Sequence, residues 1–139
     1  MRRAGLGLTT VMVLSLWAAA AWAQAEKSSA KAAAEPVVKQ LEAFRRDDYD
    51  TAYTFASEEI RTRFDRPAFE AMVRGGYPEI ARSTFASVTG TELRPDGSAY
   101  VTIKIRGANG QTVEALYELV WQGAWKINGV ATRPGAGVI

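Results

Sequence analysis

The chain has 139 residues, with 17 Lys and Arg against 15 Asp and Glu, and it contains neither cysteine nor histidine. This nearly neutral balance argues against a nucleic-acid or anionic-membrane partner, because both need clustered positive charge. Without cysteine there are no disulfides, so stability has to come from the core. Without histidine, the side chain best suited to acid–base chemistry at neutral pH is missing.

Residues 1–23 have the pattern of a signal peptide. Two arginines precede an apolar stretch, and Ala21 and Ala23 have the small-x-small spacing of a cleavage site. Cleavage after Ala23 fits best, and cleavage after Ala25 is a second frame. An uncleaved membrane anchor is the alternative, although so short an apolar run seldom spans a bilayer. We expect an exported, periplasmic or secreted protein, whose residues 24–139 carry 15 basic and 15 acidic side chains.

The chain after the leader divides into a linker, one domain and a tail. Residues 24–34 are small and polar, without apolar periodicity, and we interpret them as a flexible tether. The domain is expected over 35–133, and 134–139 are expected to form a disordered tail. An apolar stripe at three- and four-residue spacing predicts the first helix over 35–48, with Pro36 in its first turn.

Capping residues predict three further short helices. Asp50 is expected to cap the first of them, and Ser57 to cap a second over 58–64. A third starts around Asp65 and ends at the glycine pair 75–76.

After residue 78 the apolar period changes to two, which predicts four β-strands. The first lies within 80–93 and the second covers 98–106. Asn109-Gly110 predicts a hairpin with a type I′ turn, since both residues tolerate positive φ. The last two strands occupy 111–133 and join around Gln122-Gly123, and a bulge is expected at 128–129 in the fourth strand. Helices followed by an antiparallel meander indicate an α+β domain with the helices packed on one face of a curved sheet.

The last hairpin carries a continuous aromatic wall on one face. The wall alternates along the third strand and continues after the turn, and it consists of Val113, Ala115, Tyr117, Leu119, Trp121, Trp125 and Ile127. We expect this wall to face the helices, with Glu114 and Glu118 facing water or pairing with Lys104 and Arg106. A conical cavity between sheet and helices would follow.

Four segments together resemble a family of small exported bacterial proteins classed as a domain of unknown function, in the nuclear-transport-factor-2-like superfamily. The superfamily includes ketosteroid isomerase and scytalone dehydratase. The matching segments are LEAFRRDD at 41–48, MVRGGYP at 72–78, ALYEL at 115–119 and WKING at 125–129. The resemblance covers 35–133 and implies helices over a four-stranded curved sheet that encloses a cone. It implies no activity and no functional residues.

The candidate sites divide into catalytic and ligand-binding residues. Glu118 or Asp50 would be the general base if a carboxylate lay inside the cone, and the enzyme would then be a lyase or isomerase acting on a small hydrophobic substrate. No metal-ligand spacing or phosphate-binding loop is present in the sequence, and no cofactor is expected. The candidate pocket lining consists of Tyr77, Arg74, Tyr117, Trp121 and Trp125.

The favoured hypothesis is a non-catalytic domain that binds a small apolar ligand or a protein partner. Large aromatic side chains also dominate small cores, so the wall by itself favours a packed core, and both interpretations hold if the cone is incompletely filled. A third hypothesis is a homodimeric structural module of the cell envelope, which pairs through Tyr100, Leu116 and Val120 on the outer sheet face.

Overall fold

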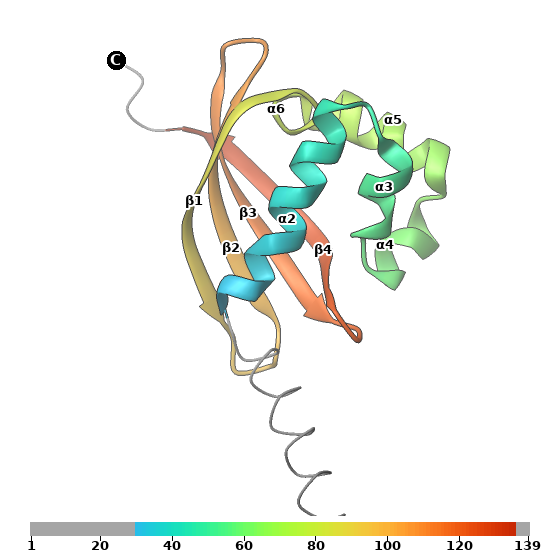
Figure 1. Ribbon diagram of the computed structural model, residues 1–139, viewed down its shortest axis with the longest axis vertical. Coiled ribbons are helices and arrows are strands. Elements are labelled where there is room, and N and C mark those ends of the chain that lie inside the picture. Colours follow the sequence, from blue (N-terminus) through green and yellow to red (C-terminus); the bar gives the residue numbers. More distant parts are fainter. Residues whose placement is uncertain (1–29, 136–139) are drawn as a thin grey trace, which may run out of the picture.

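The computed structural model describes residues 30–135, in which five helices precede one antiparallel sheet (Figure 1). The helices are α2 (Ala30–Arg45), α3 (Tyr49–Thr54), α4 (Glu58–Arg63), α5 (Arg66–Gly76) and α6 (Pro78–Ala81). The strands are β1 (Ser83–Leu93), β2 (Ala99–Gly107), β3 (Thr112–Trp121) and β4 (Trp125–Pro134), in the spatial order β1-β2-β3-β4. The predicted α+β class is confirmed. The expected signal peptide lies outside the described residues.

Helix α2 starts earlier than predicted, and Pro36 lies inside it rather than in its first turn. Residues 30–34, assigned above to the tether, are therefore helical, and the remainder of that tether lies outside the described residues. The correction has a physical reason, because alanine is the best helix former and its small side chain allows close packing. Ala33 is fully buried and belongs to the core.

The turn after α2 closes the helix and sets up α3. Asp47 adopts φ 55°, and the amides of Asp47 and Asp48 donate to the carbonyls of Phe44 and Ala43, which is the Schellman pattern. Asp48, not Asp50, then caps α3, because its carboxylate accepts from the Thr51 amide at 3.1 Å. The hydrogen bonds from Thr51 lower the pKa of Asp48.

The next two helices begin where the sequence predicts. The Ser57 hydroxyl accepts from the Ile60 amide at the start of α4, and the Asp65 carboxylate accepts from the Ala68 amide at the start of α5. Helix α5 extends to Gly76. Both helix starts follow the preference of Ser and Asp for the N-cap position.

The β2–β3 hairpin forms at Asn109-Gly110, but without the predicted type I′ turn. Asp47 is the one non-glycine residue with positive φ among residues 30–135, so Asn109 lacks the geometry that type I′ needs. Instead, Gly110 has φ 80°, its amide donates to the carbonyl of Gly107, and the Gly107 amide donates to the carbonyl of Gln111. The loop is thus one residue longer, with a glycine in the left-handed region before the strand resumes.

The predicted bulge in β4 is confirmed. Glu118 pairs with Gly129 while the next residue, Leu119, pairs with Ile127, so Asn128 is the extra residue on β4. The turn between β3 and β4 also lies where predicted, with Gly123 at φ 79°. A bulge bends its strand and increases the local twist. The bulge therefore bends β4 at Asn128, in the part of the strand that lies next to α4.

The aromatic wall faces the helices, as predicted. Tyr117, Leu119, Trp125 and Ile127 are buried, and Trp121 is half-buried. Helix α2 crosses this face of the sheet, and α3, α4 and α5 lie to one side of it, towards β4 (Figure 1). The core therefore forms between α2 and the inner faces of the strands. The expected disordered tail starts at Pro134, which instead ends β4, and 136–139 lie outside the described residues.

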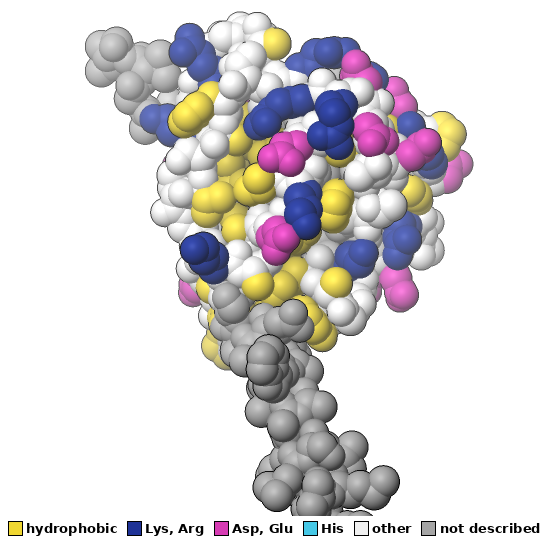
Figure 2. Space-filling view, viewed as in Figure 1, with side chains coloured by type: hydrophobic (Ala, Val, Ile, Leu, Met, Phe, Trp, Pro, Cys, Tyr) yellow, Lys and Arg dark blue, Asp and Glu magenta, His cyan; other side chains and the backbone are white. Residues whose placement is uncertain are grey.

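Charged side chains of both signs are mixed on the helical face of the molecule, and apolar side chains show between α2 and β1 (Figure 2). Val38 of α2 and Val88 of β1 are 39% and 40% exposed there. No helix among residues 30–135 has the length and apolar character needed to cross a membrane.

Candidate functional site: an apolar cavity beside β4

A cavity of about 290 Å³ lies between the short helices α4 and α5 and the β3–β4 side of the sheet. Its lining is mainly aliphatic and aromatic, and it comes from helices and strands that are far apart in the sequence. The lining residues are Gln40, Phe44, Ala56, Ile60, Arg63, Phe64, Phe69, Met72, Val73, Tyr77, Ile80, Tyr117, Ile127, Asn128, Gly129 and Val130. Apolar clefts with few polar groups are the usual form of small-ligand sites.

Helix α4 borders the cavity and is attached to β4 through the segment that precedes it. The segment before α4 runs beside β4, where the Ser57 amide donates to the Ile127 carbonyl and the Ile127 amide donates to the Phe55 carbonyl, each at 2.8 Å. Helix α4 then leaves the sheet, and none of its six residues is buried. Ile60 is half-buried and lines the cavity.

Two tyrosines, Tyr77 and Tyr117, are among the lining residues. Tyr117 of β3 is 1% exposed, and its hydroxyl has no hydrogen-bond partner among residues 30–135. Burial, and to a lesser extent the nearby Tyr77, raises the pKa of Tyr117 above its ordinary value. The hydroxyl therefore remains a neutral donor at physiological pH. The Tyr77 hydroxyl donates to the Val130 carbonyl at 3.4 Å, which is long for an O–H···O bond.

A chain of hydrogen bonds crosses the sheet at the β4 bulge. The Ser57 hydroxyl donates to Asn128 Oδ1 at 2.7 Å, and Asn128 Nδ2 donates to Glu118 Oε1 at 2.8 Å. Ser57 is fully buried, and Asn128 lines the cavity. The bulge thus places the Asn128 side-chain amide between Ser57, at the start of α4, and Glu118, on the outer face of the sheet.

The predicted ligand-binding residues divide among three places. Tyr77 and Tyr117 both line the cavity. Trp121 and Trp125 do not line it, because they lie at the turn of the β3–β4 hairpin, beside the start of α2. There they form a shallow depression with Phe55 and Pro36, and the two indole rings contact edge to face at 5.4 Å. The Trp125 indole nitrogen is buried without a partner in the described part of the chain.

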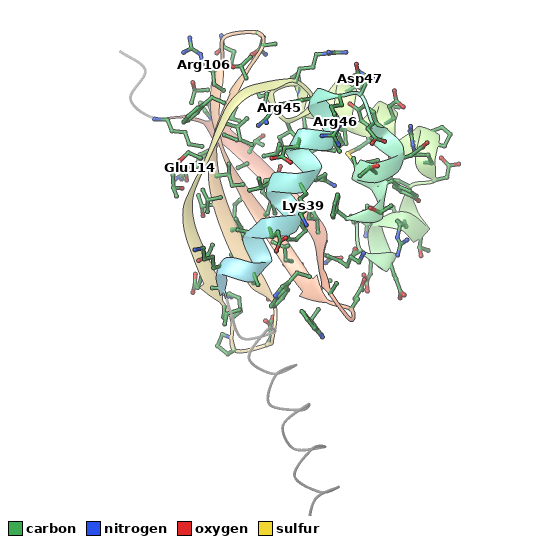
Figure 3. The ribbon with its side chains drawn as sticks, viewed as in Figure 1. Lys39, Arg45, Arg46, Asp47, Arg106 and Glu114 are labelled. Atoms are coloured by element: carbon green, nitrogen blue, oxygen red, sulfur yellow. The ribbon has the colours of Figure 1, made fainter. Side chains whose placement is uncertain are left out.

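Arg74 lies in neither place, because it lines neither the cavity nor the depression beside α2. It points across α5 to an ion-pair network in which it bonds Glu70 at 2.8 Å and Asp47 at 3.2 Å. Its guanidinium also lies 4.5 Å from the centroid of the Tyr49 ring. Hydrogen bonds from Arg66 and Arg74 lower the pKa of Glu70. Figure 3 shows Asp47 just after the end of α2, on the side of the molecule where α3 and α5 lie.

Neither candidate general base lines the cavity. Asp50 lies on α3 with its side chain 87% exposed, and it pairs with Arg66 at 2.7 Å. Glu118 is half-buried on the opposite face of the sheet from Tyr117 and contacts the cavity only through Asn128. No Asp or Glu among residues 30–135 lines the cavity. Within the same range no group of three metal-ligating side chains forms.

Glu114 faces outward, as predicted, but with a different partner. It lies opposite Lys104 in the strand register, yet its ion pair is with Arg133 of β4, at 2.6 Å. Figure 3 shows Glu114 on the sheet side of the molecule, away from the short helices. Leu116 lies on the same outer face and is 43% exposed.

Sequence reasoning missed three polar residues of the cavity, namely Gln40, Arg63 and Asn128. Gln40 carried a signal, because it lies on the apolar stripe of α2, three residues after Val37. It is buried, and its Nε2 donates to the Ala52 carbonyl at 3.1 Å. Asn128 was recognised only as a bulge position. Nothing distinguishes Arg63 from the other arginines of this region in the sequence.

Comparison with known proteins gives a family but no characterised relative. A family model described as "Domain of unknown function (DUF4864)" matches residues 26–138. A search of the curated proteins found no match, and neither did a search of the solved structures. The match spans most of the chain and the entire described structure. The chain therefore belongs to the DUF4864 family.

Proposed function

We propose that this protein is a non-catalytic domain that binds a small apolar ligand in the cavity between α4, α5 and β4. One observation carries the proposal: a cavity of about 290 Å³ has a mainly apolar wall, and this wall includes Tyr117, whose buried hydroxyl has no partner among residues 30–135. Leaving a buried polar group unpaired costs about 1–3 kcal/mol. A ligand that accepts this hydrogen bond would recover that cost while filling the cavity.

The ligand chemistry follows from the lining. Phe44, Phe64 and Met72 provide an apolar surface that excludes large polar molecules. Because Tyr117 stays protonated, it donates its hydrogen bond, so the ligand presents an acceptor oxygen on its apolar body. The ligand is thus small, mainly apolar and carries at least one oxygen.

The architecture supports a place in the nuclear-transport-factor-2-like superfamily. Helices that precede a four-stranded antiparallel sheet, with a cavity between helices and strands, agree with the cone that the sequence resemblance implies. Location outside the cytoplasm is part of the same proposal. It is supported by the arginine pair, the apolar stretch and the small residues before Ala23.

A lyase or isomerase is the weaker alternative, because it would need a carboxylate inside the cavity. Glu118 approaches it only through Asn128, and Asp50 is on the surface. Changing Glu118 to Gln would keep the hydrogen bond to Asn128 and leave ligand binding unchanged in a binding protein. Loss of a turnover activity in this variant would instead support the enzyme.

A second candidate function is a homodimeric structural module. Leu116 is exposed on the outer face, where it pairs with Thr102. Tyr100 and Val120 are half-buried on the same face, and Tyr100 pairs with Glu118, which lies between Leu116 and Val120 on β3. Light scattering at high protein concentration would test it. A dimer that the Leu116→Lys substitution dissociates would support this module, whereas monomers throughout would dispose of it.

Native mass spectrometry of the protein purified from its own cells tests the binding proposal. We expect a retained adduct of small mass, or restored binding of a neutral apolar probe such as methyl 4-methoxycinnamate after ligand removal. The Val130→Phe substitution, which fills the cavity, should abolish both. A protein that binds no such probe, or that binds it equally well after the Val130→Phe substitution, would contradict the proposal. Capture of an envelope protein instead would favour a protein partner.

A further inference from the structure

Arg63 is the charged residue of the cavity lining. It is the last residue of α4, it is exposed, and it belongs to the lining, so we place it at the edge where the cavity meets solvent. Among residues 30–135 its guanidinium has no ion-pair or hydrogen-bond partner. Arginine forms bidentate hydrogen bonds to carboxylates, so a free guanidinium at an opening favours an anionic group.

The carboxylate expected to neutralise Arg63 is engaged elsewhere. Glu59 lies four residues earlier on the same helix face, the spacing that favours an ion pair. Its Oε2 instead accepts from Gln122 Nε2 at 2.9 Å. The Glu59 backbone amide and this bond lower the pKa of Glu59, so the acid is ionised but does not reach Arg63. The guanidinium at the opening is left available.

Arg63 and Tyr117 occupy chemically opposite positions in the cavity. Arg63 is an exposed cation at the opening, whereas Tyr117 is a neutral donor in the buried wall. A carboxylate placed in the buried part would lose its hydration without meeting a cation, which is strongly unfavourable. The same carboxylate at the opening keeps part of its hydration and lies beside Arg63. The two groups therefore orient an asymmetric ligand.

We infer that the ligand is a small carboxylic acid with an apolar body. Its carboxylate lies at the opening beside Arg63, its body fills the apolar interior, and an oxygen at its buried end accepts a hydrogen bond from Tyr117. This inference rests on the proposed function, since it assigns the ligand class of the same cavity. It adds a charge requirement that binding of an apolar molecule does not have.

A purely structural role for Arg63 has a separate explanation. Basic side chains in the last turn of a helix interact favourably with its dipole, and α4 has two, Arg61 and Arg63. Arg61 is exposed on the same short helix but does not line the cavity. It is therefore the matched control, because both arginines share the dipole and only Arg63 borders the site.

The test is isothermal titration of the full chain with three probes at neutral pH. The probes are 4-methoxycinnamate, its methyl ester, which lacks the charge, and 4-ethylcinnamate, which keeps the charge but lacks the terminal oxygen. We expect Arg63→Gln to weaken binding of both acids about two- to fivefold, as for exposed ion pairs, and to leave the ester unchanged. Arg61→Gln should leave all three unchanged.

The Tyr117→Phe substitution tests the buried end. It should weaken the binding of 4-methoxycinnamate and of the ester about three- to tenfold, the effect of one hydrogen bond, and leave the binding of 4-ethylcinnamate unchanged. Added salt should weaken the binding of the two acids and not that of the ester, because salt screens exposed charge pairs. Thermal unfolding of each variant checks that the fold is retained.

The outcomes separate this inference from the proposed function. If the ester binds as tightly as the acid, or if Arg63→Gln and Arg61→Gln have equal effects on the acids, the carboxylate assignment is overturned while apolar binding stands. If none of the three probes binds to the wild-type chain, both the inference and the proposed function are overturned.

Discussion

The helical layer has two halves that pack on the sheet in different ways. On the α2 half, Val37 and Leu41 are almost completely buried. On the α4–α5 half, α4 has no buried residue and α5 has two, Phe69 and Val73. Both halves carry apolar residues at helical spacing. The comparison shows that apolar periodicity predicts which side chains face inward and does not predict whether the interior is filled.

The difference follows from helix length and attachment. Helix α2 has 16 residues and crosses the inner face of the sheet, so several turns contact the strands (Figure 1). Helix α4 has six residues and is attached to β4 through the strand-like segment before it. A helix this short buries little surface of its own and is held by its connections. The interior beside β4 remains open as a result.

The largest expected effect comes from shortening a buried side chain of α2, in the half where the helix packs closely on the sheet. Leu41→Ala should lower the free energy of unfolding by about 2–5 kcal/mol, because a fully buried leucine leaves a cavity that cannot collapse. Met72→Ala, which enlarges an existing cavity, should cost clearly less. Urea unfolding of the two variants gives the comparison. Equal losses would mean that the two halves are packed alike.

Enlarging side chains should give the opposite pattern. Val101 is completely buried in β2, and Val101→Phe should cost about 1–3 kcal/mol by overpacking. Val130 of β4 lines the cavity, and its substitution by Phe should change the stability by less than about 1 kcal/mol, because space is available. Thermal unfolding measures both. A severe loss in the Val130 variant would show that no such space exists.

The attachment of α4 should depend on Ser57. Its buried hydroxyl caps the helix and bonds Asn128, so Ser57→Ala should cost about 1–2 kcal/mol. Ser87→Ala in β1, where no hydrogen bond involves the side chain within the described residues, is the control and should stay within about 0.5 kcal/mol. Local hydrogen exchange should also rise in α4. Unchanged exchange there would argue against Ser57 as the attachment.

The smallest effect should appear at high pH. The pKa of Tyr117 is raised in the folded state, so the unfolded chain loses this proton first as the pH rises. The stability that protonated Tyr117 contributes to the folded state is therefore fully present below about pH 10, the ordinary pKa of tyrosine, and is lost as the pH rises above that value. Unfolding measured from about pH 8 to about pH 11, on either side of that value, should show a decline that is smaller in Tyr117→Phe. An identical decline would contradict the burial of this hydroxyl.

The sequence predicted the fold well where one local signal sufficed. Ser57 and Asp65 cap the helices expected of them, and the Asn128 bulge lies where a glycine follows an asparagine inside a strand. The cap of α3 was predicted at Asp50 but lies two residues earlier at Asp48, so that the buried Tyr49 is the first residue of the helix. The early start of α2 was missed because alanines show no apolar period.

The site was predicted only in part, for a related reason. The alternation in β3 places Tyr117 on the inner face, but nothing local tells whether a helix fills the space in front of it. Trp125 has the same inward orientation, yet the hairpin carries it under α2 and away from the cavity. Arg63 is recognisable only once α4 has been placed beside β4. Such relations arise between elements and not within them.

The most direct test of the account is the crystal structure of the protein under xenon pressure, since xenon binds in apolar cavities that polar molecules do not enter. The account predicts xenon density beside Tyr117, between α4, α5 and β4, and none between α2 and the sheet. An interior without xenon beside Tyr117, with Ile60 and Met72 packed onto β4, would contradict it.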